Sequence, residues 1–170
     1  MTREVAANLI GVAAEAVRIG DLDTLERSLN AGVAANAVTV RGDSLLMLAA
    51  YHGHGRAVSL LLARGADPNQ RDAKGQAPLA GVAFKGLIDI AELLVAGGAD
   101  VNAAAADGKT PLAMAAAFNR ADMVRWLLAR GADKERRDAT GASPIGIALA
   151  MGARDAAAAL SAASQPPRKD

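Results

Sequence analysis

Short apolar segments recur along the chain, each bounded by glycine or polar residues. Within a segment the apolar side chains stand three and four residues apart, which places them on one face of a helix. Three such sets follow one another: Val58, Leu61 and Leu62; Ile90, Leu94 and Val95; and Val124, Leu127 and Leu128. The pattern predicts three amphipathic helices, each ending at a glycine.

Two series of glycines show that this pattern has a fixed period. One runs through Gly42, Gly75, Gly108 and Gly141, and the other through Gly32, Gly65, Gly98 and Gly131, both at intervals of 33 residues. The segments 64–67, 97–100 and 130–133 repeat in sequence as well as in spacing. Such a period predicts a solenoid built from repeated units.

Each unit carries its own start and stop signals. Thr110-Pro111 and Ser143-Pro144 predict helix starts, because the hydroxyl accepts free N–H groups and proline suits the first helical turn. These helices should end at Gly53, Gly86, Asn119 and Gly152, since both residue types tolerate a left-handed backbone. A second helix follows, and then an extended turn rich in Asp, Asn, Pro and Gly.

The run from Asp107 to Leu112, followed by Gly131-Ala132-Asp133, resembles the consensus of the ankyrin-repeat family. The resemblance covers 8–163 and implies an all-α ankyrin solenoid of about five helix-turn-helix units joined by extended β-turn fingers. We divide this single domain into a cap unit 8–40, inner units 41–73, 74–106 and 107–139, and a second cap 140–163. An N-terminal extension over 1–7 and a disordered tail over 164–170 complete the chain.

The sequence departs from the family pattern at several positions. The histidine that the family carries after Thr-Pro-Leu is replaced by Met47, Ala80, Ala113 and Gly146. We therefore expect the family's hydrogen bonds between neighbouring turns to be absent and the turns to be softer. The unit 74–106 departs furthest, because Ala77 replaces a capping hydroxyl and Ala105 a turn aspartate. The aspartates Asp67, Asp100 and Asp133 are expected to bond the local backbone.

Composition and charge exclude several classes of function. The chain has 19 Lys and Arg against 18 Asp and Glu, and these charges are spread out, which argues against nucleic acid and against an anionic membrane. No apolar run reaches the ~20 residues that span a bilayer, and no secretory signal is visible. The absence of cysteine removes disulfides and thiolate nucleophiles. We expect a soluble, cytoplasmic monomer without a cofactor.

The resemblance places the contact surface for a partner protein on the concave face formed by the turn tips and the first helices. The implied contact positions are the two residues before each mid-unit glycine: Arg18 and Ile19, Tyr51 and His52, Phe84 and Lys85, Ala117 and Phe118, and Ala150 and Met151. Three of the four aromatic side chains fall in this set, and aromatic residues often anchor interfaces. The turn tips add polar candidates: Arg41, Asp43, Lys74, Gln76, Asp107, Lys109 and Thr140.

Several of these candidates have a structural alternative. The aromatic residues of the contact set would equally fill space between helices rich in alanine, and the turn tips would form a solvated edge. Trp126 stands 33 residues after Leu93 and so occupies a core position. His52 and His54 are two residues apart, which is poor metal geometry on a helix, and His54 matches a structural turn position of the family.

Three functional hypotheses follow, in order of preference. The first is a non-catalytic module that binds another protein on its concave face. The second is a regulator or immunity-type inhibitor of one cognate enzyme or toxin. The third is an enzyme that uses His52 and His54, the least favoured because no metal site, nucleophile or phosphate-binding glycine motif is apparent in the sequence.

Overall fold

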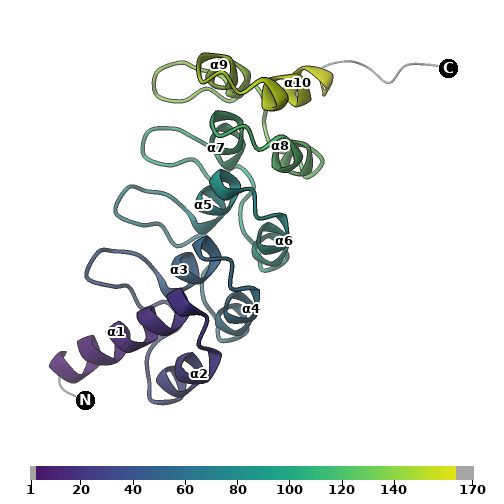
Figure 1. The fold of residues 1–170 in the computed structure, drawn as a ribbon. Helices are drawn as coiled ribbons and strands as arrows, with labels where there is room; N and C mark the ends of the chain where they lie inside the picture. The colour runs from purple at the N-terminus through teal and green to yellow at the C-terminus, as the bar shows by residue number, and fades with distance from the viewer. Residues whose placement is uncertain (1–2, 164–170) are drawn as a thin grey trace.

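The protein is a stack of helix pairs (Figure 1). The structure, a computed structural model, describes residues 3–163. This range holds ten helices: α1 (Arg3–Ile19), α2 (Leu22–Asn30), α3 (Leu45–Tyr51), α4 (Gly55–Ala63), α5 (Pro78–Lys85), α6 (Ile88–Ala96), α7 (Pro111–Ala117), α8 (Ala121–Leu128), α9 (Pro144–Ala150) and α10 (Arg154–Ala162). The helix-turn-helix solenoid predicted from the sequence is confirmed.

The helices form two layers that run the length of the molecule (Figure 1). The first helices of the pairs, α1, α3, α5, α7 and α9, pack each on the next, and every first helix also packs against its own second helix. The loops 31–44, 64–77, 97–110 and 129–143 join one pair to the next, and we call them fingers. They project side by side from the layer of first helices (Figure 1). None of the helices in 3–163 combines the length and apolar character needed to cross a bilayer.

The first helices begin and end where local chemistry predicts. Thr110 and Ser143 each accept a hydrogen bond from the backbone N–H three residues on, which satisfies one of the free donors of a helix N-terminus. Ala77 has the same extended backbone, with φ −86° and ψ 158°, but no side chain to cap α5. The mid-unit glycines all have positive φ, and Asn119 takes their place at φ 56°.

A ladder of asparagine side chains joins neighbouring fingers. Asn69 donates from Nδ2 to the carbonyl oxygen of Gly98 at 2.9 Å and accepts at Oδ1 from the backbone N–H of Asp100 at 2.7 Å. Asn36 and Asn102 make the same pair of bonds to the units that follow them. Although the family's histidine is absent, neighbouring turns are therefore hydrogen-bonded to one another, because one amide side chain supplies both a donor and an acceptor to the next unit.

Aspartates stabilise the fingers 64–77, 97–110 and 129–143 from within. The carboxylates of Asp67, Asp100 and Asp133 accept from the backbone N–H two residues on, as predicted. Asp72 goes further and accepts from two backbone N–H groups, at 2.8 and 2.9 Å, which closes the tip of its finger. Ala105 occupies the equivalent place one unit later and cannot do this, so the predicted weak point of unit 74–106 lies in its side-chain bonds.

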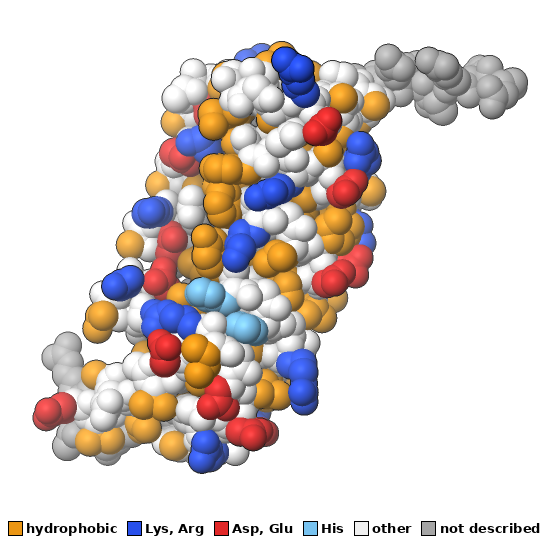
Figure 2. Space-filling view, viewed as in Figure 1, with side chains coloured by type: hydrophobic (Ala, Val, Ile, Leu, Met, Phe, Trp, Pro, Cys, Tyr) orange, Lys and Arg blue, Asp and Glu red, His pale blue; other side chains and the backbone are white. Residues whose placement is uncertain are grey.

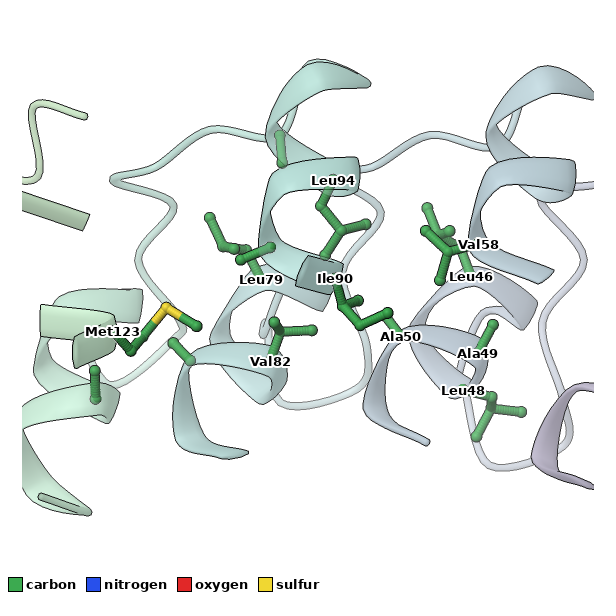
Figure 3. Packing of buried hydrophobic residues seen from close by; sticks show 14 of the residues in the cluster. Leu46, Leu48, Ala49, Ala50, Val58, Leu79, Val82, Ile90, Leu94 and Met123 are labelled. Carbon is green, nitrogen blue, oxygen red and sulfur yellow. The ribbon is translucent and has the colours of Figure 1, made fainter. Parts of the chain in front are cut away.

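The core consists of small and branched aliphatic residues that recur with the period. Leu61, Leu94, Leu127 and Leu160 lie 33 residues apart and are all buried. In Figure 3, Ile90 and Leu94 lie on the side of their unit that faces Val58 and Ala50 of the preceding unit, and Leu79 lies on the other side, toward Met123. The period predicts a core position for Trp126, but this side chain packs against the core from its edge and remains partly exposed.

The two ends of the stack differ from the inner units. Helix α1 begins at Arg3 and is 17 residues long, so most of the extension expected over 1–7 is part of a helix that no proline or capping hydroxyl interrupts. Helix α10 closes the other end with small side chains, including the buried Ala156, Ala157 and Ala159. The tail predicted over 164–170 lies outside the described residues.

Candidate functional site

A groove of about 460 Å³ lies between the fingers and the layer of first helices. Its floor comes from α3, α5 and α7, and one wall comes from the fingertips that precede α3 and α5. The residues that line it are Arg18, Arg41, Asp43, Met47, Leu48, Tyr51, His52, Asp72, Gln76, Ala77, Pro78, Gly81, Phe84, Met114 and Phe118. Eight of these are candidates from the sequence: Arg18, Arg41, Asp43, Tyr51, His52, Gln76, Phe84 and Phe118.

Three aromatic rings from successive units form a continuous row along this groove. The rings of Tyr51 and Phe84 are parallel, with centroids 6.4 Å apart and an interplanar angle of 6°. Phe84 and Phe118 meet edge to face, with centroids 4.3 Å apart. In Figure 2 hydrophobic side chains form a column upward from the two histidines, and this aromatic row belongs to that face.

The exposure of these rings bears on whether they are packing residues. Tyr51 is 41% exposed and Phe118 is 42% exposed, while Phe84 between them is partly buried. The rings therefore contact one another and still present area to solvent. An exposed aromatic row is a feature that monomeric proteins seldom carry without a use. We call Tyr51, Phe84 and Phe118 the aromatic row.

Gly81 opens the groove beneath the first ring. A Cβ atom added at this position would stand 3.3 Å from Cδ2 of Tyr51, closer than ordinary van der Waals contact. Leu48, Met114 and Ile147 occupy the same place in other units. The sequence reading missed Gly81, although a glycine inside a helix at a position that is otherwise large and apolar was a visible signal.

Outside the groove, on the side of the aromatic row away from the fingers, helix-end carbonyl groups hold a second row of side chains. Each bond joins a side chain of one unit to the carbonyl near the end of the preceding first helix: His54 Nε2 to Arg18 O at 2.9 Å, Lys85 Nζ to Tyr51 O at 2.9 Å, and Arg120 Nε to Phe84 O at 3.0 Å. The acceptors lie 33 residues apart. These carbonyls lack a partner within their helices, so cationic or N–H donors satisfy them.

The two histidines have different environments. His54 uses its Nε2 hydrogen for the Arg18 carbonyl, and its ring lies under Gly20, where a Cβ would stand 2.8 Å from Nδ1. Its structural role agrees with the prediction. His52 is exposed, and its pKa is lowered first by desolvation of the ring and then by the positive charges of Lys85, His54 and Arg18.

The fingers beside the groove carry charges of both signs. Asp107 and Lys109 form an ion pair at 2.6 Å, so hydrogen bonding to Lys109 lowers the pKa of Asp107 and hydrogen bonding to Asp107 raises the pKa of Lys109. Asp43 lies in the groove, and no hydrogen bond or ion pair engages its carboxylate within residues 3–163. The wall thus offers both donors and acceptors.

Nine predicted contact residues do not line the groove: Ile19, Lys74, Lys85, Asp107, Lys109, Ala117, Thr140, Ala150 and Met151. Ile19 and Met151 are 65% and 61% exposed, so both present apolar surface at the period positions predicted for contact. Lys85 borders the row instead, with Nζ 4.5 Å from the centroid of the Tyr51 ring. The structure thus brings eight of the predicted contact residues together in one groove, and the others lie outside it.

Within residues 3–163 no group of three His, Asp or Glu side chains is arranged to hold a metal ion. In the same range no buried side-chain polar atom lacks a hydrogen-bond partner. The groove instead combines apolar rings with peripheral charged groups, which is the usual composition of a protein contact surface.

Comparison with known proteins agrees with the fold. A family model described as ankyrin repeats (3 copies) matches residues 12–105 and 86–170. No curated protein sequence matches the chain significantly. Members of the matched family generally bind other proteins and are typically non-catalytic. Because the two matched segments overlap and together cover nearly the whole stack of helix pairs, the chain belongs to the ankyrin-repeat family.

Proposed function

We propose that this protein is a non-catalytic binding module whose partner protein occupies the groove between the fingers and the first helices. The observation that carries the proposal is the aromatic row. It is continuous over three units, partly exposed, and set on helices that pack rigidly on one another. Rigid aromatic side chains offer large contact area at low cost in conformational entropy, and they are the most frequent energetic centres of interfaces.

The polar residues around the row would give this contact its specificity. Arg41, Asp43 and Gln76 stand on the finger wall, within the same groove as the rings. Charged groups at the margin of an apolar centre mainly select the partner and orient it, because they remain partly solvated. Arg18, Ile19 and Met151 would extend the contact toward the two ends of the stack.

The test has two stages. Affinity purification from the native host followed by mass spectrometry would identify the partner, and isothermal titration calorimetry would measure its affinity. The triple variant Tyr51→Ala/Phe84→Ala/Phe118→Ala should then weaken binding by at least ~100-fold, since each interface anchor contributes about 1–2 kcal/mol or more.

A matched control separates this effect from loss of structure. Trp126→Leu removes an aromatic ring from the layer of second helices and introduces leucine, the residue at the equivalent positions Leu60 and Leu93. It should leave the partner's affinity unchanged. If the triple variant kept its helical circular dichroism and bound the partner as well as the unmodified protein, the groove would not be the binding site.

A further inference from the structure

The two sides of the aromatic row differ in charge. On the finger side, Arg41, Asp43 and Asp72 line the groove, and the next finger pairs Asp107 with Lys109. On the other side, just outside the groove, the turns between first and second helices carry Lys85 and Arg120. Neither cation forms an ion pair with a described residue. In Figure 2, Lys and Arg side chains stand directly beside the hydrophobic column on this side.

The carboxylates that share a hollow with Lys85 and Arg120 are already engaged. Asp155 accepts from Asn119 at 2.9 Å, and Asp122 pairs with Arg125 at 2.6 Å. Arg125 compensates the charge of Asp122, so Asp155 alone opposes the two cations and the hollow keeps a net positive charge. The pKa of His52 is lowered first by desolvation of its ring and then by the positive charges of Lys85, His54 and Arg18, with Glu15 opposing them.

Both cations are fixed in place and retain unused hydrogen-bond donors. Lys85 gives one of its three N–H bonds to the Tyr51 carbonyl and packs over the Tyr51 ring. Arg120 binds the Phe84 carbonyl through Nε, and no bond engages its terminal nitrogens within residues 3–163. Because these side chains are held before a partner arrives, less conformational entropy is lost when they bind an anion.

We propose that the partner segment in this groove is acidic as well as apolar, with carboxylates that lie against Lys85 and Arg120 while its apolar side chains cover the aromatic row. This inference rests on the proposed function, and it adds the chemistry of the partner. An Asp or Glu placed beside a Leu, Phe or Trp would fit the two features, which lie side by side. The bare finger-wall carboxylate of Asp43 would repel the same segment if it bound in the opposite orientation.

The experiment uses a phage-displayed library of random peptides selected on the intact protein. The selected peptides should be enriched in Asp and Glu next to large apolar residues. The affinity of a representative peptide, measured by fluorescence anisotropy, should fall as sodium chloride is raised. It should also fall roughly tenfold in Lys85→Gln/Arg120→Gln, as expected for the loss of two partly exposed ion pairs.

Two further variants isolate the charge. Lys85→Arg/Arg120→Lys keeps both cations and should retain the affinity of the unmodified protein, provided circular dichroism shows the same fold. Arg64→Gln/Arg130→Gln removes the same amount of charge from side chains paired with Glu26 and Glu92, away from both the groove and the hollow that holds Lys85 and Arg120. This control should change the affinity little.

The outcomes distinguish the inference from the proposed function. Selected peptides that are neutral or basic, yet depend on the aromatic row, would overturn the acidic partner and leave the proposed function intact. Peptides whose binding ignores the triple aromatic variant would contradict the proposed function itself. Competition by oligothymidylate at the same site would assign the cations to nucleic acid and would likewise overturn the inference.

Discussion

Gly81 shows how a single side chain changes what one position of the repeat does. The units have the same backbone conformation, so residues at equivalent positions differ only in their side chains. Leu48 and Met114 fill the place that Gly81 leaves open, and the Tyr51 ring lies across the opening. One inner unit therefore leaves the groove without a side chain at this position.

Replacing this glycine should separate stability from binding. Gly81→Ala should stabilise the protein by up to about 1 kcal/mol, because alanine favours the helix, and it should displace the Tyr51 ring that lies 3.3 Å from the new Cβ. Urea unfolding measures the first effect and partner or peptide affinity the second. Gly11→Ala in α1, where no atom lies within 4 Å, should add stability without a change in affinity. Reduced affinity in Gly11→Ala as well would contradict this account.

The second residue-scale prediction concerns the titration of His52. Its pKa should lie below the usual value of a histidine, because desolvation and three neighbouring positive charges disfavour the imidazolium form. Lys85→Gln removes one of those charges and should raise the pKa of His52. Arg125→Gln, whose partner is Asp122, should leave it unchanged. Nuclear magnetic resonance titration of the His52 ring protons measures this pKa in the unmodified protein and in both variants. An unaltered pKa in Lys85→Gln would contradict the excess of positive charge described around Lys85.

At the scale of elements, the fingers are held by local caps and by bonds to the next unit. Aspartates bond the backbone within the fingers 64–77, 97–110 and 129–143, whereas Asn36, Asn69 and Asn102 tie one finger to its neighbour. The backbone adds a bond from the N–H of Ala139 to the carbonyl oxygen of Asp107 at 2.9 Å. Hydrogen bonds thus connect each finger to the next, so the relative positions of the fingers depend on these asparagines.

Removing one rung of the ladder should have a measurable cost. Asn69→Ala deletes the bonds to Gly98 and to Asp100 and leaves a carbonyl and an N–H without their partner. We expect a loss of roughly 1–2 kcal/mol in the free energy of unfolding, measured with urea, because both groups are partly solvated in the variant. Asn8→Ala, at an exposed position of α1, is the control. Equal stability of the two variants would show that the ladder contributes nothing.

The first helices offer a complementary change. Ala77 has the backbone geometry of the capped positions but lacks the hydroxyl, and Thr110 supplies it one unit later. Ala77→Ser should therefore raise stability by about 1 kcal/mol, and Thr110→Ala should lower it by a similar amount. Urea midpoints of both variants test the pair. A destabilised Ala77→Ser would indicate that the buried site cannot accept the oxygen.

At the scale of the whole molecule, each pair of helices packs mainly against its neighbours, so stability is distributed unevenly along the stack. The unit 74–106 lacks a helix cap at Ala77 and a turn aspartate at Ala105. The last unit, 140–163, has a neighbour on one side and a second helix made mostly of alanine. Both features reduce the local free energy of opening.

Hydrogen exchange measured by mass spectrometry should therefore show faster exchange in 74–106 and 140–163 than in 107–139. Ala77→Ser should slow exchange in the first of these segments only. Uniform protection along the stack would mean that the units open together, and that the missing caps are compensated by contacts between units.

The sequence by itself determined the period, the helix boundaries and the turns. These follow from local chemistry, since proline, hydroxyl caps and left-handed glycines act within a few residues of their own position. The resemblance to the ankyrin-repeat family singled out Tyr51, Phe84 and Phe118 as candidate contact positions, and the structure places these three rings side by side along the groove.

The tertiary structure alone decided which of those side chains touch and what surrounds them. The aromatic row, the opening at Gly81, the asparagine ladder and the cations bound to helix-end carbonyls all join residues about 29 to 36 apart in the chain. Their geometry depends on how closely one unit stacks on the next, and no local signal encodes that distance. The difference in charge between the two sides of the aromatic row arises in the same way, because it depends on which carboxylates the stacking places near Lys85 and Arg120.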